Sequence, residues 1–439
     1  FHASGGNWIA MELLGLATAA GCWPEFKQAD GWFAYAVSRI MPEMTRQVYP
    51  DGVQKELTSH YHWVALRSFD RFVALADQVG RPIPEGFRDG IERMYNYLAY
   101  TMRPSGYGPL NNDSNLDYTC AMVLEAAQRF DRPDWTYTAT QGAEGTAPDK
   151  GPSVVFPWAG QAVMRSGWDA EAQWAFFDVG PMGTGHWHLD KLHLSVSAFG
   201  RDILVDAGRY TYKGGPWRDY FVGSSSHNVI LVDNGGQNAF NREAHKPMQH
   251  NYAVTPEWDF ARATFEAGFG GIEGAATHTR AVLYVRGQYW IVVDRIETDR
   301  PRKITLLWHF HPDCTVAVEG TCVASTDEDR GNIRITPASE LPWKVEVVKG
   351  QTEPQIQGWW SREYNIKEPS PCAVYTTPIE GTSTFAWLIV PAKGVVPDTG
   401  ASLAAVTDAD AELHVPVREG ETRNFAIPFE RAAVRCETR

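Results

Sequence analysis

In the first 140 residues, apolar side chains recur at intervals of three and four, the spacing that gathers them on one face of a helix. Residues 9–20 are rich in Ala, Leu and Met, which favour helices. Trp63, Leu66 and Phe69 share one helical face, and Thr58 precedes them as an N-cap. Helices in series predict a helical array or (α/α) toroid. The predicted helices cover residues 9–20, 31–47, 59–75, 85–102 and 115–129.

After about residue 140 the pattern changes to short runs of β-branched and aromatic residues separated by turns. Residues 141–148, rich in Gly, Ala and Glu, are typical of a linker. We therefore expect an α+β multidomain chain. An incomplete (α/α) toroid would span 1–140, a large antiparallel β-sandwich 141–345, and a C-terminal β unit that completes or extends the sandwich 346–439. Strands are predicted at 174–179, 192–199, 203–206, 229–232, 280–285, 289–293 and 304–310.

The length and the charge of the chain limit the classes of function that it can have. At roughly 150 residues per domain, 439 residues suffice for two or three domains. The net charge of −13 argues against a nucleic-acid partner but leaves room for a local basic groove. No apolar run approaches the ~20 residues of a membrane-spanning helix. The six cysteines form no CxxC pair. Phe1 in place of Met is typical of a mature form or a fragment.

The strongest chemical signal is Gly-His-Trp-His-Leu-Asp at residues 185–190. In an extended chain, side chains two apart share a face, so His186, His188 and Asp190 would project together. Asp206 and His227 follow on segments predicted to be neighbouring strands. Two imidazoles and a carboxylate from three neighbouring strands would suit a tetrahedral zinc site. Ordinary surface histidines are the alternative interpretation.

Two further signals lie in the helical half. Tyr61 stands near the start of a predicted helix, where the positive end of the helix dipole favours a phenolate. Aromatic packing between helices is the alternative. Asn7 also stands at a helix start, where asparagine is commonly an N-cap.

Several short blocks occur in a fixed order within residues 5–240: Asn7-Trp8, Pro24 to Lys27, Gln47 to Gly52, Glu56-Leu57, Tyr61-His62, Met164 to Trp168, Gly183 to Asp190, Leu204 to Gly208, and Trp217 to Asn228. Together they resemble the heparinase II/III polysaccharide lyases, and the helical half is most similar to heparinase III-type enzymes. The resemblance fades beyond about residue 315. Two departures stand out: only six residues precede Asn7, and Trp8 stands where relatives often have histidine.

The resemblance implies a lyase that cleaves a uronic-acid polysaccharide, with a heparan sulfate-like polymer favoured, by β-elimination to C4–C5 unsaturated products. Asn7 would neutralise the uronate carboxylate, and Tyr61 and His186 would be the catalytic base and acid, in an order left open. His188, Asp206 and His227 would hold a structural Zn²⁺. The resemblance also implies an anionic polysaccharide or oligosaccharide partner and a bacterial periplasmic or secreted location, and leaves oligomerisation open. Candidate substrate-binding residues are Trp8, Glu56, His62, Tyr107, Asn111, Asp113, Arg218 and Tyr220.

Other functions stay open at this point. In the first alternative, the protein is a lyase whose substrate is alginate or another uronate polymer. A glycoside hydrolase would need two carboxylates about 5–10 Å apart, for which Glu56 and Asp113 are the candidates. A non-catalytic carbohydrate-binding protein is the third possibility, and a hydrolase with a catalytic zinc, which needs an open coordination position, is the fourth.

Overall fold

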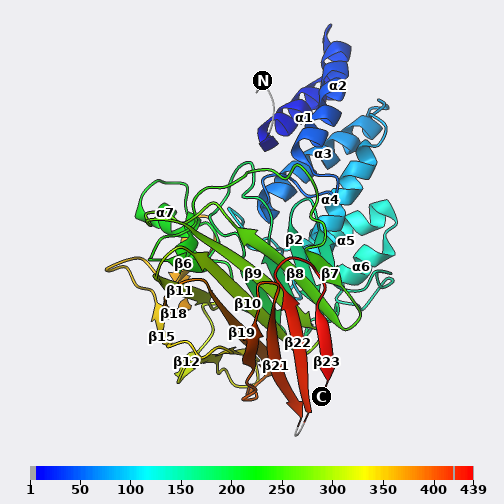
Figure 1. Ribbon diagram of the computed structural model, residues 1–439. Coiled ribbons are helices and arrows are strands. Elements are labelled where there is room, and N and C mark those ends of the chain that lie inside the picture. The colour runs from blue at the N-terminus through cyan, green and yellow to red at the C-terminus, as the bar shows by residue number, and fades with distance from the viewer. Residues whose placement is uncertain (1–5, 419–420, 439) are drawn as a thin grey trace.

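A computed structural model describes residues 6–418 and 421–438. Phe1, from which a mature form or a fragment was expected, lies outside the described residues. Within the described residues, six helices precede the first strand (Figure 1). The helices are α1 (Gly6–Cys22), α2 (Ala29–Gln47), α3 (Ser59–Gln78), α4 (Phe87–Thr101), α5 (Thr119–Phe130) and α6 (Pro133–Ala139). Five of them correspond to the predicted helices, and the short α6 was not predicted. Helix α1 packs against both α2 and α3, and α3, α4, α5 and α6 pack one against the next, which gives an incomplete toroid of helices. No described helix combines the length and apolar character that crossing a membrane requires.

Helix α3 shows how local sequence places a site residue. The Thr58 hydroxyl accepts a hydrogen bond from the Tyr61 backbone N–H at 2.9 Å, which caps the helix and puts Tyr61 in its first turn. Leu66, Phe69 and Phe72, further along α3, are fully buried in the core of the helical half. The cap therefore fixes Tyr61 at the start of a helix that is anchored by its buried apolar side chains.

One predicted boundary was wrong. Helix α5 begins at Thr119, four residues later than the predicted start at Asn115. The reason is a tertiary contact: the Leu116 backbone N–H donates to the Arg362 carbonyl at 2.7 Å, which holds this stretch in a loop.

The β half is built from antiparallel sheets, as predicted. A five-stranded sheet follows chain order, and its turns join consecutive strands. A short helix, α7 (Pro216–Val222), comes after it. Its strands are β1 (Val154–Phe156), β2 (Gln161–Arg165), β3 (Trp174–Asp178), β4 (Leu194–Ala198) and β5 (Arg201–Leu204).

An eight-stranded sheet has the order β12-β13-β14-β19-β10-β9-β8-β7. Apolar side chains from this sheet, the first sheet and a third share one core, centred on large residues such as Trp290, Trp308 and Trp387. The strands of the eight-stranded sheet are β7 (Tyr252–Val254), β8 (Trp258–Phe265), β9 (Ala276–Val285), β10 (Tyr289–Thr298), β12 (Val316–Glu319), β13 (Cys322–Ser325), β14 (Gly331–Pro337) and β19 (Ser383–Lys393).

The third sheet has the order β15-β18-β11-β6, and two smaller sheets complete the β half. Residues beyond 345 thus contribute β18 and β19 to the main sheets and also form an outer sheet. The strands of the third sheet are β6 (Ile230–Val232), β11 (Arg302–His309), β15 (Lys344–Lys349) and β18 (Pro371–Ile379). The remaining strands are β16 (Trp359–Glu363), β17 (Ile366–Pro369), β20 (Ser402–Val406), β21 (Asp410–Arg418), β22 (Glu421–Pro428) and β23 (Arg435–Thr438).

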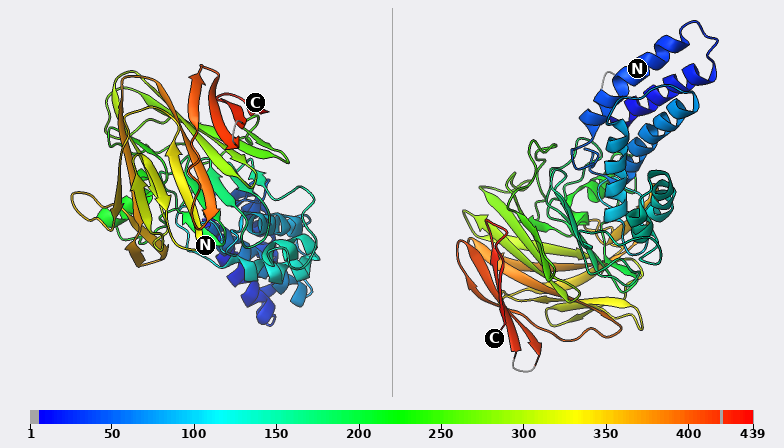
Figure 2. Two further views of the ribbon diagram at one scale, coloured as in Figure 1. Left: turned by 90° about the horizontal axis from the view of Figure 1, so that it is seen from below. Right: turned by 90° about the vertical axis from the view of Figure 1, so that its right-hand side faces the viewer.

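The helices project from one end of the sheets (Figure 2). Side chains fasten the two halves together at this junction. The Asp51 carboxylate accepts backbone N–H bonds from Trp158 at 2.8 Å and from Ala159 at 3.2 Å. The buried Arg103 guanidinium donates to the Asp202 carboxylate at 2.9 Å. Buried, charge-assisted hydrogen bonds of this kind fix the relative position of the halves, and the candidate site lies where they meet.

Candidate active site and metal centre

Three loops meet between the helices and the sheets: residues 53–58 before α3, residues 105–118 before α5, and residues 183–190 between β3 and β4. The Asn111 and Asn112 side-chain amides both donate to the Leu57 carbonyl, at 2.6 and 2.9 Å. The His188 backbone N–H donates to the Asn112 side-chain oxygen at 2.8 Å. The loop at 105–118 therefore braces the other two.

The backbone is strained where these loops meet. Leu57, Asn112 and His186 have φ values of +58°, +54° and +57°, in the left-handed region that L residues rarely adopt. A Cβ on Gly183 would lie 2.5 Å from the Glu56 carbonyl oxygen, so only glycine allows the loop to approach so closely. Strain of this kind persists where the surrounding structure enforces it, and it is concentrated at functional sites.

The same geometry corrects one expectation. Residues 186–190 do not form an extended strand, because His186 is left-handed and the segment is a loop. His186 and His188 nevertheless come together, because both imidazoles bond to the carboxylate of Asp113. Asp190 is buried close enough to His227 and His188 for their charges to oppose the rise in its pKa that burial causes.

Tyr61 and His186 form the centre of the site. Their rings are stacked, with centroids 3.6 Å apart and an interplanar angle of 10°. Tyr61 comes from α3 and His186 from the loop after β3, so the contact joins the two halves of the molecule. The Tyr61 hydroxyl also lies 2.7 Å from the Tyr212 hydroxyl. Burial and that hydrogen bond raise the pKa of Tyr212 above its usual value, which keeps Tyr212 a neutral phenol.

Asp113 holds the His186 ring in place through a hydrogen bond. Its side chain is fully buried and accepts from His186 Nδ1 at 3.2 Å, from His188 Nε2 at 3.0 Å and from both terminal nitrogens of Arg218. Burial alone would raise the pKa of Asp113, but the hydrogen bonds from His186, His188 and Arg218 lower it well below its usual range. Because Asp113 is a carboxylate, His186 carries a proton on Nδ1 and its Nε2 is directed elsewhere.

Glu56 lies on the other side of His186. Its Oε2 atom is 3.8 Å from His186 Nε2, and its carboxylate accepts a hydrogen bond from the Asn7 backbone N–H at the start of α1. Burial raises the pKa of Glu56, while the nearby His186 opposes the increase. Asn7 is also largely buried. Glu56 thus ties the first turn of α1 to the tyrosine–histidine pair.

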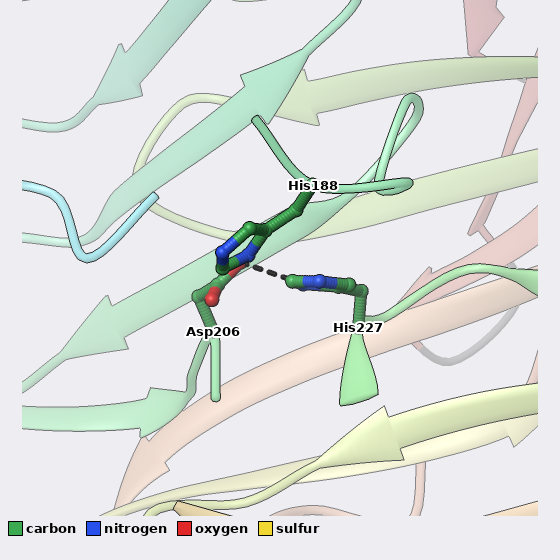
Figure 3. Close-up of side chains that lie close together, drawn as sticks. All are labelled: His188, Asp206 and His227. Atoms are coloured by element: carbon green, nitrogen blue, oxygen red, sulfur yellow. Dashed lines mark hydrogen bonds and ion pairs between the residues drawn. The ribbon is translucent and has the colours of Figure 1, made fainter. Parts of the chain in front are cut away.

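His188, Asp206 and His227 converge in the interior behind the site (Figure 3). One potential ligand atom from each lies within 4.8 Å of the others, and all three residues are buried. His227 Nδ1 is 2.9 Å from an Asp206 oxygen. Burial alone would raise the pKa of Asp206 and lower that of His227. The attraction between them reverses both effects, so the pKa of Asp206 is lowered and that of His227 is raised.

The donor set suits a divalent metal ion. His188 Nδ1 and His227 Nε2 are buried and have no hydrogen-bond partner among the described residues. Unpartnered buried nitrogen atoms cost free energy, and a metal ion would satisfy them. His188 bonds to Asp113 through its other nitrogen, the arrangement in which a carboxylate orients a metal-binding histidine. Two imidazoles and one carboxylate are therefore available to a metal.

Three candidate substrate-binding residues are corrected. His62 is fully buried, accepts from the Gln54 N–H at Nδ1 and donates from Nε2 to the Met94 carbonyl, so it joins loop and helices instead of contacting substrate. The Tyr220 hydroxyl is buried and donates to Gln357. Asn111 is buried against the Leu57 carbonyl.

The other candidates have varied positions. Trp8 is 65% exposed on the first turn of α1. Tyr107 packs edge-on against Tyr118 with ring centroids 5.2 Å apart. Arg218 is half-buried and lines a pocket of about 550 Å³ together with His186, Trp187, Tyr212 and Asp219.

Sequence reasoning missed three residues beside Tyr61. Arg209 donates hydrogen bonds to the Tyr212 hydroxyl and to the Asn115 side chain. Tyr212 itself is 41% exposed. Tyr364 lies at the turn between β16 and β17, and its ring centroid is 5.6 Å from that of Tyr212. Backbone hydrogen bonds from Ser361 to Ala207 and from Asn365 to Tyr210 hold this hairpin at the site. Tyr364 lies beyond the segment in which the resemblance was visible, so no sequence signal pointed to it.

The fold and site define a class: a helical toroid on an antiparallel sandwich, with a tyrosine–histidine pair between them and a buried His/Asp/His group behind it. The chain belongs to the heparinase II/III family. The family description "Heparinase II/III N-terminus" matches residues 1–132, and "Heparinase II/III-like, C-terminal" matches residues 148–394.

Curated relatives agree with this membership. The chain is 24% identical over 378 residues to a heparin-sulfate lyase of Bacteroides stercoris, covering 83% of this chain and 53% of that protein. It is 25% identical over 407 residues to a heparin-sulfate lyase of Pedobacter heparinus, covering 90% of this chain and 59% of that protein. The chain thus spans a little more than half the length of these relatives.

Solved structures show the same fold. The heparan sulfate lyase HepC from Pedobacter heparinus superposes with a TM-score of 0.83 at 23% identity, covering 98% of this chain and 67% of that one. A heparinase III structure gives 0.82 at 20% identity, covering 97% and 68%. The predicted combination of helical toroid and β-sandwich is confirmed.

Proposed function

We propose that the protein is a polysaccharide lyase that cleaves a uronic-acid-containing polysaccharide by β-elimination. The observation that carries the proposal is the stacked pair of Tyr61 and His186, which offers a hydroxyl donor and a nitrogen acceptor at one point between the two halves. Asp113 supports the assignment because it occupies His186 Nδ1 and leaves Nε2 as the basic nitrogen. Elimination needs one group to remove a proton and another to supply one.

In the proposed reaction, His186 Nε2 removes the C5 proton of the uronate. The C4–O4 bond breaks, a double bond forms between C4 and C5, and O4 takes the proton of the Tyr61 hydroxyl. The Asn7 side-chain amide would bind the uronate carboxylate and stabilise the enolate-like charge that develops there. The Glu56 carboxyl, 3.8 Å from His186 Nε2, would stabilise the imidazolium. Return of the proton from His186 to Tyr61 completes the cycle.

We infer that the metal is zinc and that His188, Asp206 and His227 hold it. The ion would supply structural cross-linking, since its ligands come from three separate loops. The chain's own residues carry the catalytic work. His188 shares the Asp113 carboxylate with His186, so whatever fixes His188 also fixes the orientation of the His186 ring.

A heparan sulfate-like glycosaminoglycan is the favoured substrate, since the named relatives are heparin-sulfate lyases. Alginate or another uronate polymer is the second candidate. The glycoside hydrolase alternative loses support because the carboxylate of Asp113 is enclosed by His186, His188 and Arg218 and cannot reach a glycosidic bond. We further propose a periplasmic or secreted location, where such polymers are encountered.

The test is ultraviolet absorbance during incubation with heparan sulfate, heparin, chondroitin, hyaluronan, alginate and polyglucuronate. Elimination leaves a double bond conjugated to the carboxylate, which absorbs, whereas hydrolysis leaves none. Tyr61→Phe is the matched variant, because it removes one hydroxyl and keeps the ring stacked on His186. We expect absorbance to rise on one polymer with the wild type and not with this variant. New reducing ends without absorbance would contradict the proposal.

A further inference from the structure

A groove of about 590 Å³ runs between α1 and α3, outside the site described above. We call it the α1–α3 groove. It begins beside His60, the neighbour of Tyr61, and extends along α3 to Arg71 and across to Trp23 after α1. At a helical rise of 1.5 Å per residue, the eleven steps from His60 to Arg71 span about 16 Å. The His60 ring packs edge-on against the Tyr61 ring with centroids 5.2 Å apart, so one end of the groove lies beside the catalytic pair.

Two arginines that line the groove have no hydrogen-bond or ion-pair partner among the described residues. Arg67 and Arg71 are exposed, and within residues 6–418 and 421–438 neither side chain makes a hydrogen bond or an ion pair. Elsewhere in the helical half, Arg129 pairs with Asp70 and Arg132 pairs with Asp134. Arg67 and Arg71 are four residues apart on one helix face, where like charges destabilise the helix. Stability therefore does not explain this pair, whereas an anionic ligand would.

The rest of the lining suits a carbohydrate. Trp23 is 51% exposed and Trp63 is half-buried, so both indole rings are accessible from the groove. Aromatic faces of this kind stack on apolar ring faces. The acidic group in the lining, Asp117, is already paired with His60 at 2.7 Å, so it does not cancel the two arginines.

We propose that the α1–α3 groove binds anionic saccharide units that lie several residues away from the bond being cleaved. Arg67 and Arg71 pair with sulfate or carboxylate groups, and Trp23 and Trp63 stack on the sugar rings. As a description of how the substrate is held, this inference rests on the proposed lyase function. It predicts that long chains are preferred over short ones, because only long chains reach from the catalytic site to Arg71.

The test compares the wild type with Arg67→Gln/Arg71→Gln on a tetrasaccharide and a dodecasaccharide of the cleaved polymer. The readout is the ratio of kcat/KM for the long chain to that for the short chain. Loss of two exposed ion pairs should reduce this ratio roughly fivefold, through KM, and should weaken its dependence on salt. Lys344→Gln/Arg431→Gln is the control: it removes two exposed, unpaired cations from the β half. We expect the control to keep the wild-type ratio.

Each other outcome has a defined meaning. An unchanged ratio in Arg67→Gln/Arg71→Gln, or an equal loss in the control, would overturn the proposal. Sedimentation showing a wild-type dimer that this variant dissociates would overturn it in favour of a second copy in the groove. If the wild type cleaves no polymer, the lyase proposal fails. Calorimetric titration with a heparin dodecasaccharide then tests the groove separately, and equal affinity in wild type and variant would refute it.

Discussion

Replacing Asp113 with asparagine should damage stability and catalysis together. The substitution keeps the shape of the side chain but removes its charge and turns one acceptor oxygen into an NH₂ donor. Asp113 is fully buried and accepts from His186, His188 and Arg218. An asparagine cannot accept from all of them, so at least one buried donor loses its partner.

The magnitude follows from the burial. Removing one partner of a buried ion pair costs about 3–5 kcal/mol, and Arg218 is half-buried, so we expect the lower end, about 3 kcal/mol. At about 2–4 °C per kcal/mol for a large domain, the melting temperature should fall by roughly 6–12 °C. Loss of the carboxylate also removes the bond that fixes the His186 tautomer, and kcat should fall by about 10²- to 10⁴-fold.

Two assays separate these effects. Calorimetry gives the melting temperature, and the absorbance assay on the cleaved polymer gives kcat at a temperature where the variant is folded. Arg218→Gln is the matched comparison, because it removes the ion pair while leaving the bond between Asp113 and His186. It should reproduce most of the stability loss with a much smaller effect on kcat. Equal kcat losses in the two variants, or a full rate in Asp113→Asn, would refute the reasoning.

Three further predictions concern other parts of the site. Burial lowers the pKa of His62 to about 4, below its ordinary 6.5, so the stability that the neutral ring contributes is present above about pH 6.5 and is lost as pH falls towards 4. In urea unfolding at pH 7 and pH 4, the wild type should therefore lose about 3 kcal/mol more free energy of unfolding than His62→Gln. Equal losses in the two proteins would contradict this prediction. Tyr212→Phe removes the hydroxyl that bonds to Tyr61 at 2.7 Å and should lower kcat roughly tenfold with an unchanged melting temperature, so an unaffected rate would show that Tyr61 needs no such partner. Chelation, or His227→Ala, should remove a stoichiometric metal detected by mass spectrometry and lower the melting temperature, whereas metal retained by His227→Ala would mean that the ion lies elsewhere.

Local sequence determined much of this protein. Helical spacing and the Thr58 cap determined α3 and the place of Tyr61 in its first turn. Short β-branched and aromatic runs separated by turns predicted the antiparallel sheets, because residues of these types favour strands. The spacing of His188, Asp206 and His227, together with the family blocks, identified residues that the structure brings within 4.8 Å. For the helix and the sheets, the interactions that decide the outcome lie within a few residues or are repeated along an element.

Only the tertiary structure decided how these residues act together. Asp113 was a candidate for substrate binding or for a hydrolase carboxylate, and its observed role comes from contacts with residues about 75 and 105 positions away. His62 was a candidate substrate-binding residue, but it is buried and bonds to the Gln54 and Met94 backbones. Tyr364 reaches the site through a hairpin paired with residues about 150 positions earlier. Contacts so distant in sequence depend on loop paths and sheet order, which the local propensities of neither segment encode.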